Sequence, residues 1–170
     1  QQREGFVDDA LYPDIAGCSG AFDQPGVLAA MAPACGGSGD DHLTNAAGVG
    51  CNVADLCATG WHVCSSQADI VASGATTCAD AAPGPQLIFV ARVSGGGNGT
   101  CFEGPANDVF GCGTLGSTAV QAACQPLNRW LGDGCSEDPT TTWVCPGGGE
   151  EADLVVHVDA STGGALCCRD

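Results

Sequence analysis

The chain contains no lysine, and its 4 arginines face 20 acidic residues, so its formal net charge at pH 7 is −16. Nucleic acid and anionic membrane surfaces repel a polyanion of this kind, and we expect neither as a partner. The missing lysine also excludes a phosphate-cradling loop built around a lysine ammonium group. The strong acidity instead favours solubility and tolerates cations such as calcium.

Large apolar side chains are scarce as well. Aromatic residues make up 5% of the 170 positions, whereas the chain holds 27 glycines and 9 prolines. Glycine loses backbone entropy on folding and contributes no side chain to a core. No run approaches the roughly 18 apolar residues of a membrane-spanning helix, so we expect no membrane span. Apolar burial alone is therefore not expected to hold this fold.

Cysteine is the residue that the chain has in excess. A count of 13 in 170 residues is typical of a disulfide scaffold. The Cys-x-x-Cys pair that zinc and iron–sulfur sites usually need is absent. We therefore expect disulfides, which require an oxidising compartment, and hence a secreted, extracellular protein. The cysteines are Cys18, Cys35, Cys51, Cys57, Cys64, Cys78, Cys101, Cys112, Cys124, Cys135, Cys145, Cys167 and Cys168.

The odd number of cysteines leaves one that keeps its thiol or bridges to another chain or to a small molecule. Cys167 and Cys168 are neighbours, with Cα atoms only about 3.8 Å apart, and a bond between them would close a strained ring. We expect each to bond elsewhere, or one of them to be the odd thiol. The chain starts at Gln1 without an apolar leader, as expected after signal-peptide removal. Asn98-Gly99-Thr100 is a glycosylation sequon in a Gly-rich loop.

The order of the segments predicts an α+β fold with a small antiparallel sheet, two or three short helices and long loops. We expect one disulfide-stapled domain over 1–170, with an irregular part over 1–50 and an α+β core over 51–170. Helical patterns lie at 28–32, 53–57, 65–74 and 117–131, the last weakened by a proline. Strand patterns lie at 60–64, 87–93, 140–145, 154–158 and 165–168.

One stretch carries a family resemblance. Gly60-Trp61-His62 lies between Cys57 and Cys64 and runs into the helical pattern, and Trp143-Val144-Cys145 precedes Cys167 near the end. This order resembles C-type lectin-like domains and bacterial secreted repeats related to formylglycine-generating enzymes. The resemblance implies a compact α+β fold whose long loop region binds ligands.

The resemblance does not extend to the functional motifs of these families. The lectins' calcium-and-sugar loop carries Glu-Pro-Asn or Gln-Pro-Asp, whereas this chain has Gln24-Pro25-Gly26 and Gln125-Pro126-Leu127. The paired active cysteines and copper context of a formylglycine-generating enzyme are also missing. The resemblance therefore implies fold and not calcium-dependent sugar binding.

Two groups of residues are candidate sites. Asp40, Asp41 and His42 could bring two carboxylates and an imidazole to one divalent cation, for which calcium is the candidate; a solvated acidic loop is the alternative. A ligand site is expected at Trp130, Arg129, Asn107 and Asp108, with Trp130 as the most exposed tryptophan. Arg92 and Arg129 could each anchor an anionic ligand or pair with one of the many carboxylates.

Three functions remain open. The first is a secreted binding module that recognises a small molecule, glycan or surface through Gly-rich loops, since stapled scaffolds display loops well. The second is an extracellular structural or matrix protein, cross-linked into a disulfide-linked oligomer through the odd cysteine. The third is a secreted hydrolase that uses His62 or His42 with nearby acids, although the G-x-S-x-G elbow is absent.

Overall fold

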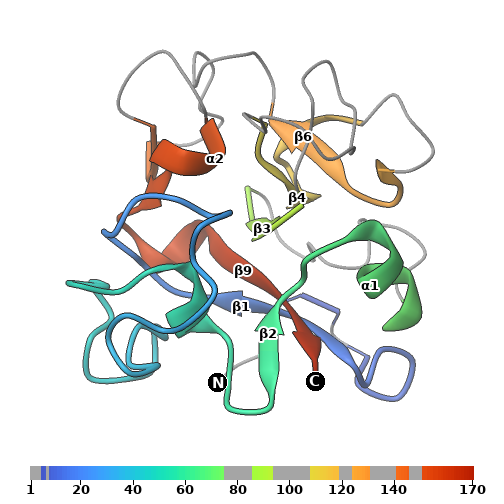
Figure 1. Cartoon of the computed structure of the whole chain (residues 1–170), viewed down its shortest axis with the longest axis horizontal. Coiled ribbons are helices and arrows are strands. Elements are labelled where there is room, and N and C mark those ends of the chain that lie inside the picture. Colours follow the sequence, from blue (N-terminus) through green and yellow to red (C-terminus); the bar gives the residue numbers. More distant parts are fainter. Residues whose placement is uncertain are drawn as a thin grey trace.

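The computed structural model describes residues 5–6, 8–74, 86–93, 108–118, 124–130, 141–145 and 151–170. In these residues the protein is a mixed α/β structure (Figure 1). The elements are β1 (Ile15–Ser19), η1 (Val53–Leu56), β2 (Trp61–Val63), α1 (Gln67–Ala72), β3 (Ile88–Ala91), β4 (Phe110–Gly113), β5 (Gly116–Thr118), β6 (Asn128–Trp130), β7 (Trp143–Val144), α2 (Glu151–Leu154), β8 (Val156–His157), η4 (Ala160–Thr162) and β9 (Gly163–Arg169). None of the helices described here is long and apolar enough to cross a bilayer.

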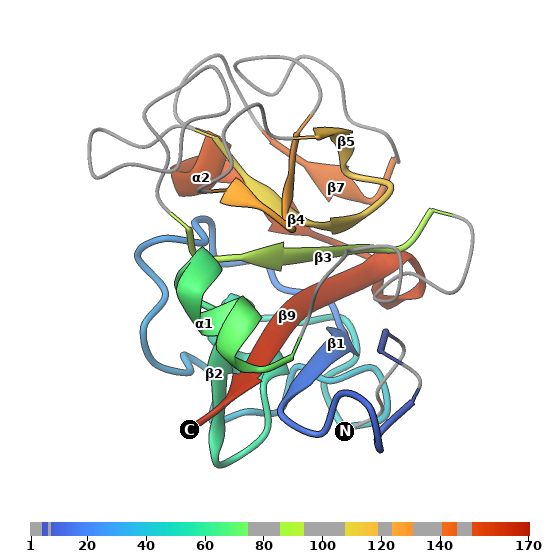
Figure 2. The ribbon, with the colours of Figure 1, turned by 90° about the vertical axis from the view of Figure 1, so that its right-hand side faces the viewer.

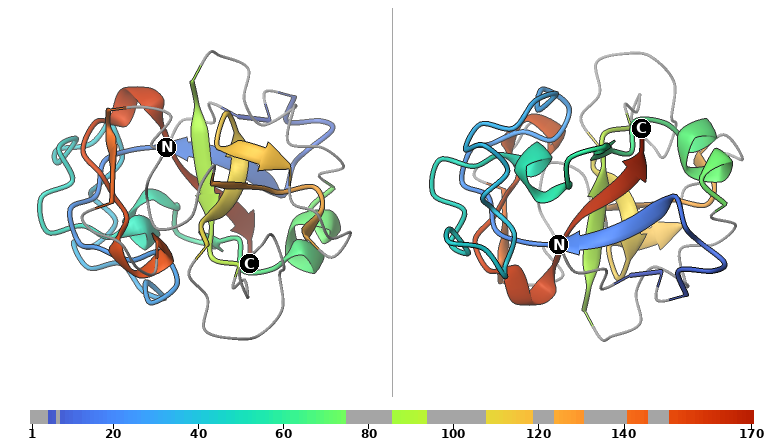
Figure 3. Two further views of the ribbon diagram at one scale, coloured as in Figure 1. Left: turned by 90° about the horizontal axis from the view of Figure 1, so that it is seen from above. Right: turned by 90° about the horizontal axis from the view of Figure 1, so that it is seen from below.

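Strand β9 organises the main sheet, which has 7 strands in the order β1-β9-β3-β4-β6-β5, with β2 also paired to β9. β1 runs antiparallel along one edge of β9, and the two cross the molecule side by side (Figure 3). The other edge is shared by β3 and β2, and β3 lies between β9 and β4 (Figure 2). Because β3 pairs with β9 in parallel, the expectation of a purely antiparallel sheet is wrong. A separate pair, β7 and β8, is antiparallel.

The start of β9 requires glycine. A Cβ at Gly163 would lie 2.0 Å from the carbonyl oxygen of Ile88, and one at Gly164 would lie 2.2 Å from that of Cys18. Gly163 also has a φ of 113°, which disfavours residues with a Cβ. These two glycines therefore allow β1 and β3 to approach β9 from both sides.

The sheet separates two groups of buried side chains. Along β3, Ile88 and Val90 pack in one group, while Phe89 and Ala91 pack in the other. This alternation follows the two-residue period of a strand. Because both faces of β3 are covered, all four of its residues are buried, and the strand predicted at 87–93 is confirmed.

Disulfides tie the segments before β3 to β9. Cys167 bonds to Cys57 and Cys168 to Cys64, across sequence separations of 110 and 104 residues. Neighbours in a strand point to opposite faces, so the two bonds staple both sides of the sheet. A third bond joins Cys35 to Cys51. The expectation that each of the adjacent cysteines bonds elsewhere is confirmed.

The remaining described cysteines differ in their bonding. Cys112, Cys124 and Cys145 are also disulfide-bonded. Cys18 keeps its thiol, and it is only 5% exposed. A bridge from Cys18 to another chain would require β1 to open, so its burial does not favour the cross-linked oligomer. Cys78, Cys101 and Cys135 lie outside the described residues.

Several elements differ from their predictions. Residues 1–50 were expected to be irregular, but they contain β1, whose 5 residues are all buried. The helix expected at 28–32 is absent, since these residues form bends and irregular backbone. In the region expected to be a weak helix, Asn128–Trp130 is a strand paired with β4 and β5. Pro126 has no N–H to donate to a helix, which disfavours the helical alternative there.

Candidate functional site

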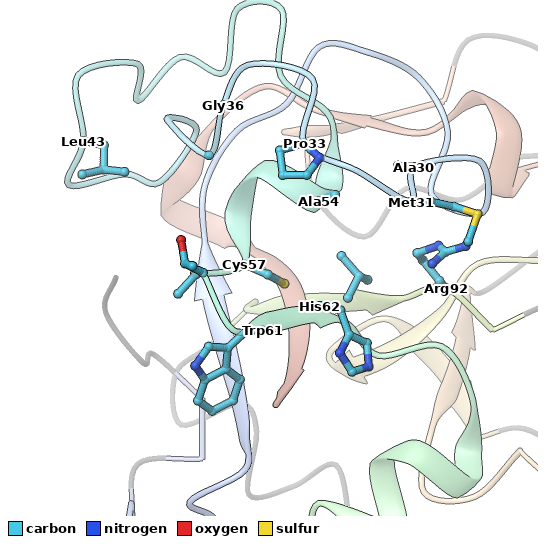
Figure 4. Close-up of a pocket in the computed structure, with 14 residues that line it drawn as sticks. Ala30, Met31, Pro33, Gly36, Leu43, Ala54, Cys57, Trp61, His62 and Arg92 are labelled. Carbon is cyan, nitrogen blue, oxygen red and sulfur yellow. The ribbon is translucent and has the colours of Figure 1, made fainter. Parts of the chain in front are cut away.

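A pocket of about 540 Å³ opens between β2 and the loop over residues 30–43 (Figure 4). Its lining combines apolar side chains with one imidazole and one guanidinium. At its mouth, Met31 is 78% exposed and Leu43 is 45% exposed, so apolar surface faces solvent here. The lining residues are Ala30, Met31, Pro33, Gly36, Gly37, Leu43, Ala54, Cys57, Ala58, Thr59, Trp61, His62, Val63 and Arg92.

The buried carboxylate of Asp55 shapes the loop wall of this pocket. Its Oδ2 accepts hydrogen bonds from the backbone N–H of Ala34 at 2.9 Å and of Asn52 at 2.8 Å. Its Oδ1 accepts from the N–H groups of Cys35 at 2.9 Å and Gly37 at 2.8 Å. Hydrogen bonds to a charged acceptor are among the stronger ones in proteins. The path of residues 34–37 is therefore set by the protein itself.

Two further contacts hold the same wall. Asn52 caps η1 by accepting from Ala54 N–H at 3.0 Å, and its side-chain amide donates to the carbonyl of Ala32 at 2.9 Å. The Cys35–Cys51 disulfide closes the loop covalently. The pocket is thus built from rigid pieces, as preformed ligand sites usually are.

Strand β2 provides the pocket with Trp61 and His62, both half-buried, whereas Val63 is buried. The guanidinium carbon of Arg169 lies 5.9 Å from the centroid of the Trp61 ring, within the range of a cation–π contact. Arg169 also pairs with Asp14, with Nη1 and Oδ1 3.4 Å apart. One face of the Trp61 ring is therefore engaged within the protein.

His62 is held by two carboxylates. Its Nδ1 lies 2.7 Å from Oδ1 of Asp170, and its Nε2 lies 3.1 Å from Oδ2 of Asp69. Partial burial lowers the pKa of His62, but the hydrogen bonds to Asp170 and Asp69 outweigh this effect and raise the pKa above its usual value. Carboxylates only accept, so the charged imidazolium, with a proton on each nitrogen, fits this geometry best.

Asp69 is itself well anchored. The same Oδ2 accepts from the backbone N–H of Ser65 at 2.9 Å and from its hydroxyl at 3.2 Å. Ser66 caps α1 by accepting from the N–H of Asp69 at 3.0 Å. The helix predicted at 65–74 is therefore confirmed, and together with its Ser66 cap it places Asp69 against the His62 ring.

This geometry does not favour the hydrolase hypothesis. A general base needs an unprotonated ring nitrogen next to the group it activates, and both nitrogens of His62 face carboxylates. Within the described residues, no serine hydroxyl hydrogen-bonds to His62. The side chain of His42 is 48% exposed and contacts Asp41, an acid, through Nδ1.

Arg92 is the second basic side chain that lines the pocket. Its Nε and Nη2 donate to the carbonyl oxygen of Leu28 at 3.2 and 3.0 Å. In the part of the chain that the structure describes, no carboxylate lies within ion-pair distance of Arg92. Arg129 differs, because its Nη1 lies 3.9 Å from Oδ2 of Asp108. Of the two alternatives considered for these arginines, the ion pair is found at Arg129, and an anionic ligand at Arg92 stays a prediction.

The residues expected to bind a ligand lie elsewhere. Asp108, Arg129 and Trp130 do come together, but they do not line the pocket. Trp130 is 1% exposed, so the expectation that it is the most exposed tryptophan is wrong: its ring packs edge-to-face against Trp143 in the core. Asn107 and the sequon residue Asn98 lie outside the described residues.

The expected cation site is brought together in space. One donor atom each from Asp40, Asp41 and His42 lie within 4.8 Å of one another. Asp40 is 1% exposed and accepts from the backbone N–H of His42 at 2.8 Å. Burial raises the pKa of Asp41, against the opposing effect of His42. The Asp40 oxygen therefore already accepts a local hydrogen bond within its own turn. The calcium site stays a prediction.

His157, on β8, is a buried polar residue that the sequence did not single out. It is 0% exposed and stacks on Trp143, with ring centroids 3.9 Å apart and planes 10° apart. Its Nδ1 donates to the carbonyl of Gly20 at 2.7 Å, and its Nε2 accepts from the hydroxyl of Thr162 at 2.9 Å. Burial lowers the pKa of His157 to about 4, so it is neutral at pH 7 and acts in the core.

Sequence reasoning also missed Asp55, Met31 and Leu43. A signal for Asp55 was present, because Asn52 and Asp55 have the spacing of a capping box. Met31 and Leu43 carry no such signal, since exposed apolar residues in loops are common.

No family model matches the chain, and no solved structure matches it. The pocket, its wall and its two basic side chains are therefore the basis for assigning a function.

Proposed function

We propose that this chain is an extracellular binding module that holds a small organic molecule in the pocket between β2 and residues 30–43. The observation that carries the proposal is the pairing of a prebuilt wall with exposed apolar side chains. Asp55 fixes the wall through four backbone N–H groups. Met31 and Leu43 leave apolar surface open at the mouth of the pocket. A concave, preformed and partly apolar site is typical of small-molecule binding.

The extracellular part of the proposal rests on the disulfides. Bonds such as Cys57–Cys167 and Cys64–Cys168 persist in oxidising compartments. A C-type-lectin-like architecture, in which loops form the ligand site, stays a prediction. The location of the pocket on a loop next to β2 supports the idea of a loop-built site in this chain.

The proposal is tested by titrating 2-naphthamide, a neutral apolar probe, into protein labelled with nitrogen-15. Amide NMR signals of Gly36, Gly37 and Thr59 should shift in a saturable way, because these residues line the pocket. Signals of Asp108 and Trp130 should stay in place. If no pocket signal moves, or if Asp108 and Trp130 respond instead, the pocket is not the ligand site.

A matched pair of variants sharpens this test. Met31→Ser removes an exposed apolar side chain inside the pocket, and Leu11→Ser removes one that is 67% exposed outside it. Loss of apolar contact should weaken probe binding about threefold to tenfold in Met31→Ser. Leu11→Ser should bind as the wild type does. Equal affinities for the two variants would contradict the proposal.

A further inference from the structure

We propose that Arg92 makes the pocket selective for ligands in which a carboxylate or sulfonate group is attached to an apolar body. This inference rests on the proposed function, because it names the class of molecule that the same pocket takes. It assigns Arg92 as the residue that determines specificity. The apolar lining would contact the body of the ligand, and the guanidinium would bind its anionic group.

The first step is the charge of the lining. The chain has 20 acidic residues and 4 arginines, yet none of the described residues that line the pocket is an aspartate or glutamate. The titratable groups in the lining are instead the side chains of Arg92 and His62. The charge of the residues that line the pocket is therefore opposite in sign to that of the whole chain, whose formal net charge is −16.

The second step is that the nearby acids are already engaged. Asp55 accepts four backbone N–H groups. Asp69 and Asp170 face the two nitrogens of His62. None of these carboxylates forms an ion pair with Arg92 in the described part of the chain. The guanidinium is thus a cation in the pocket without a partner of opposite charge from these residues.

The third step is the geometry of the guanidinium. Its Nε and one hydrogen of Nη2 are directed at the carbonyl of Leu28, which fixes the plane of the group. Arginine has five N–H donors in a rigid fork, so Nη1 keeps donors for a second acceptor. Such a fork suits the two oxygens of a carboxylate or sulfonate. Met31 is drawn next to Arg92 in Figure 4, and both line the pocket.

Arg92 could instead serve only to hold the loop at Leu28. That role predicts that the charge of a ligand has no influence on its affinity. The two roles are separated by comparing 2-naphthoate with 2-naphthamide, which have the same ring system and differ in charge. Isothermal titration calorimetry on the wild-type protein at pH 7 should give about tenfold tighter binding for 2-naphthoate, the scale of one charge-assisted hydrogen bond.

Two variants assign the preference to the residue. Arg92→Gln should bind 2-naphthoate and 2-naphthamide with equal affinity. Arg169→Gln is the matched control, since it removes the same charge outside the pocket lining and should keep the preference. Arg92→Lys keeps the charge without the fork, and an intermediate preference is expected. If Arg92→Gln does not fold, the wild-type, Arg92→Lys and Arg169→Gln comparison still decides.

Each outcome bears on one claim. Tighter binding of 2-naphthoate that Arg92→Gln abolishes and Arg169→Gln retains supports the inference. Equal binding of the two probes to the wild-type protein overturns the inference and leaves the proposed function standing. A preference that survives in Arg92→Gln also overturns it. If neither 2-naphthoate nor 2-naphthamide binds, the proposed function itself is contradicted.

Discussion

His62 and His157 both lie on short strands, and both have partners at each ring nitrogen, yet their surroundings are opposite. The side chain of His62 is 39% exposed and faces two carboxylates, whereas His157 is 0% exposed and faces a carbonyl and a hydroxyl. The pKa of His62 is raised, and that of His157 is lowered to about 4. At pH 7 the first is a candidate cation beside the pocket, and the second is a neutral ring in the core.

The difference shows that the chemistry of the partners and access to water decide what a histidine does. A carbonyl and a hydroxyl can satisfy a neutral imidazole completely, so burial of His157 costs little as long as it stays uncharged. Two carboxylates favour the charged form of His62, and partial exposure keeps that charge hydrated. One histidine therefore acts through packing, and the other through charge.

The largest expected effect is a loss of folding stability when the buried His157 is replaced. His157→Ala removes the ring that stacks on Trp143 and leaves the Gly20 carbonyl without its donor. We expect the free energy of unfolding to fall by about 3 to 4 kcal/mol, as for other buried rings. His62→Ala should cost about 1 kcal/mol or less, because exposed ion pairs contribute little. Urea denaturation of both variants measures the gap, and similar losses would break the comparison.

The second expected effect is the dependence of stability on acid. Folded His157 takes up a proton only near pH 4, whereas the unfolded chain binds it below the ordinary value of 6.5. Lowering the pH from 6.5 to 4 therefore favours the unfolded state, and this residue alone should remove about 3 kcal/mol of stability over that window. His157→Phe keeps a ring and cannot titrate.

The test compares the two proteins between pH 7 and pH 4 by urea denaturation. The wild type should lose more stability than His157→Phe over this range. Apart from Asp159, which interacts electrostatically with His157, the carboxylates contribute alike to both proteins, so the difference between the curves reports on the histidine. A difference that does not change with pH would show that His157 is not the neutral buried group described above.

The smallest expected effect concerns His62. Its raised pKa contributes stability that is fully present below pH 6.5 and is lost as the pH rises through the raised value. Asp170→Asn removes one of its two carboxylate partners and should lower the pKa of His62, with a change in stability below about 1 kcal/mol. An NMR titration of the imidazole Hε1 signal measures the pKa directly. A pKa of His62 at or below 6.5 in the wild-type protein would contradict its hydrogen bonding to Asp69 and Asp170.

Elements with a strong local signal could be predicted from the sequence. Ser66 caps α1 as its position before the helical pattern suggested, and the apolar run around Phe89 is the central strand β3. β1 and β4 could not be predicted, because their residues Ile15–Ser19 and Phe110–Gly113 are rich in alanine, glycine and cysteine. Such residues show no periodicity, and these strands are defined by pairing with β9 and β3.

The candidate site was predictable only in fragments. His62 and Arg92 stood out because basic residues are rare in this chain. Their roles depend on Asp170 and Leu28, which lie 108 and 64 positions away. Trp130 was misjudged because sequence alone does not say which tryptophan the core takes. Long-range contacts of this kind leave no trace in a single sequence.

The Asp55 carboxylate binds main-chain N–H groups and no side chain of the wall at residues 34–37. A replacement at Met31, which lines the pocket close to this wall, therefore changes the pocket surface while Asp55 keeps its backbone hydrogen bonds. In the proposed binding site, the atoms that face the ligand are therefore different from the atoms that fix the loop. Substitutions at this wall can therefore change ligand specificity with little loss of folding stability, which makes the wall a suitable starting point for engineering.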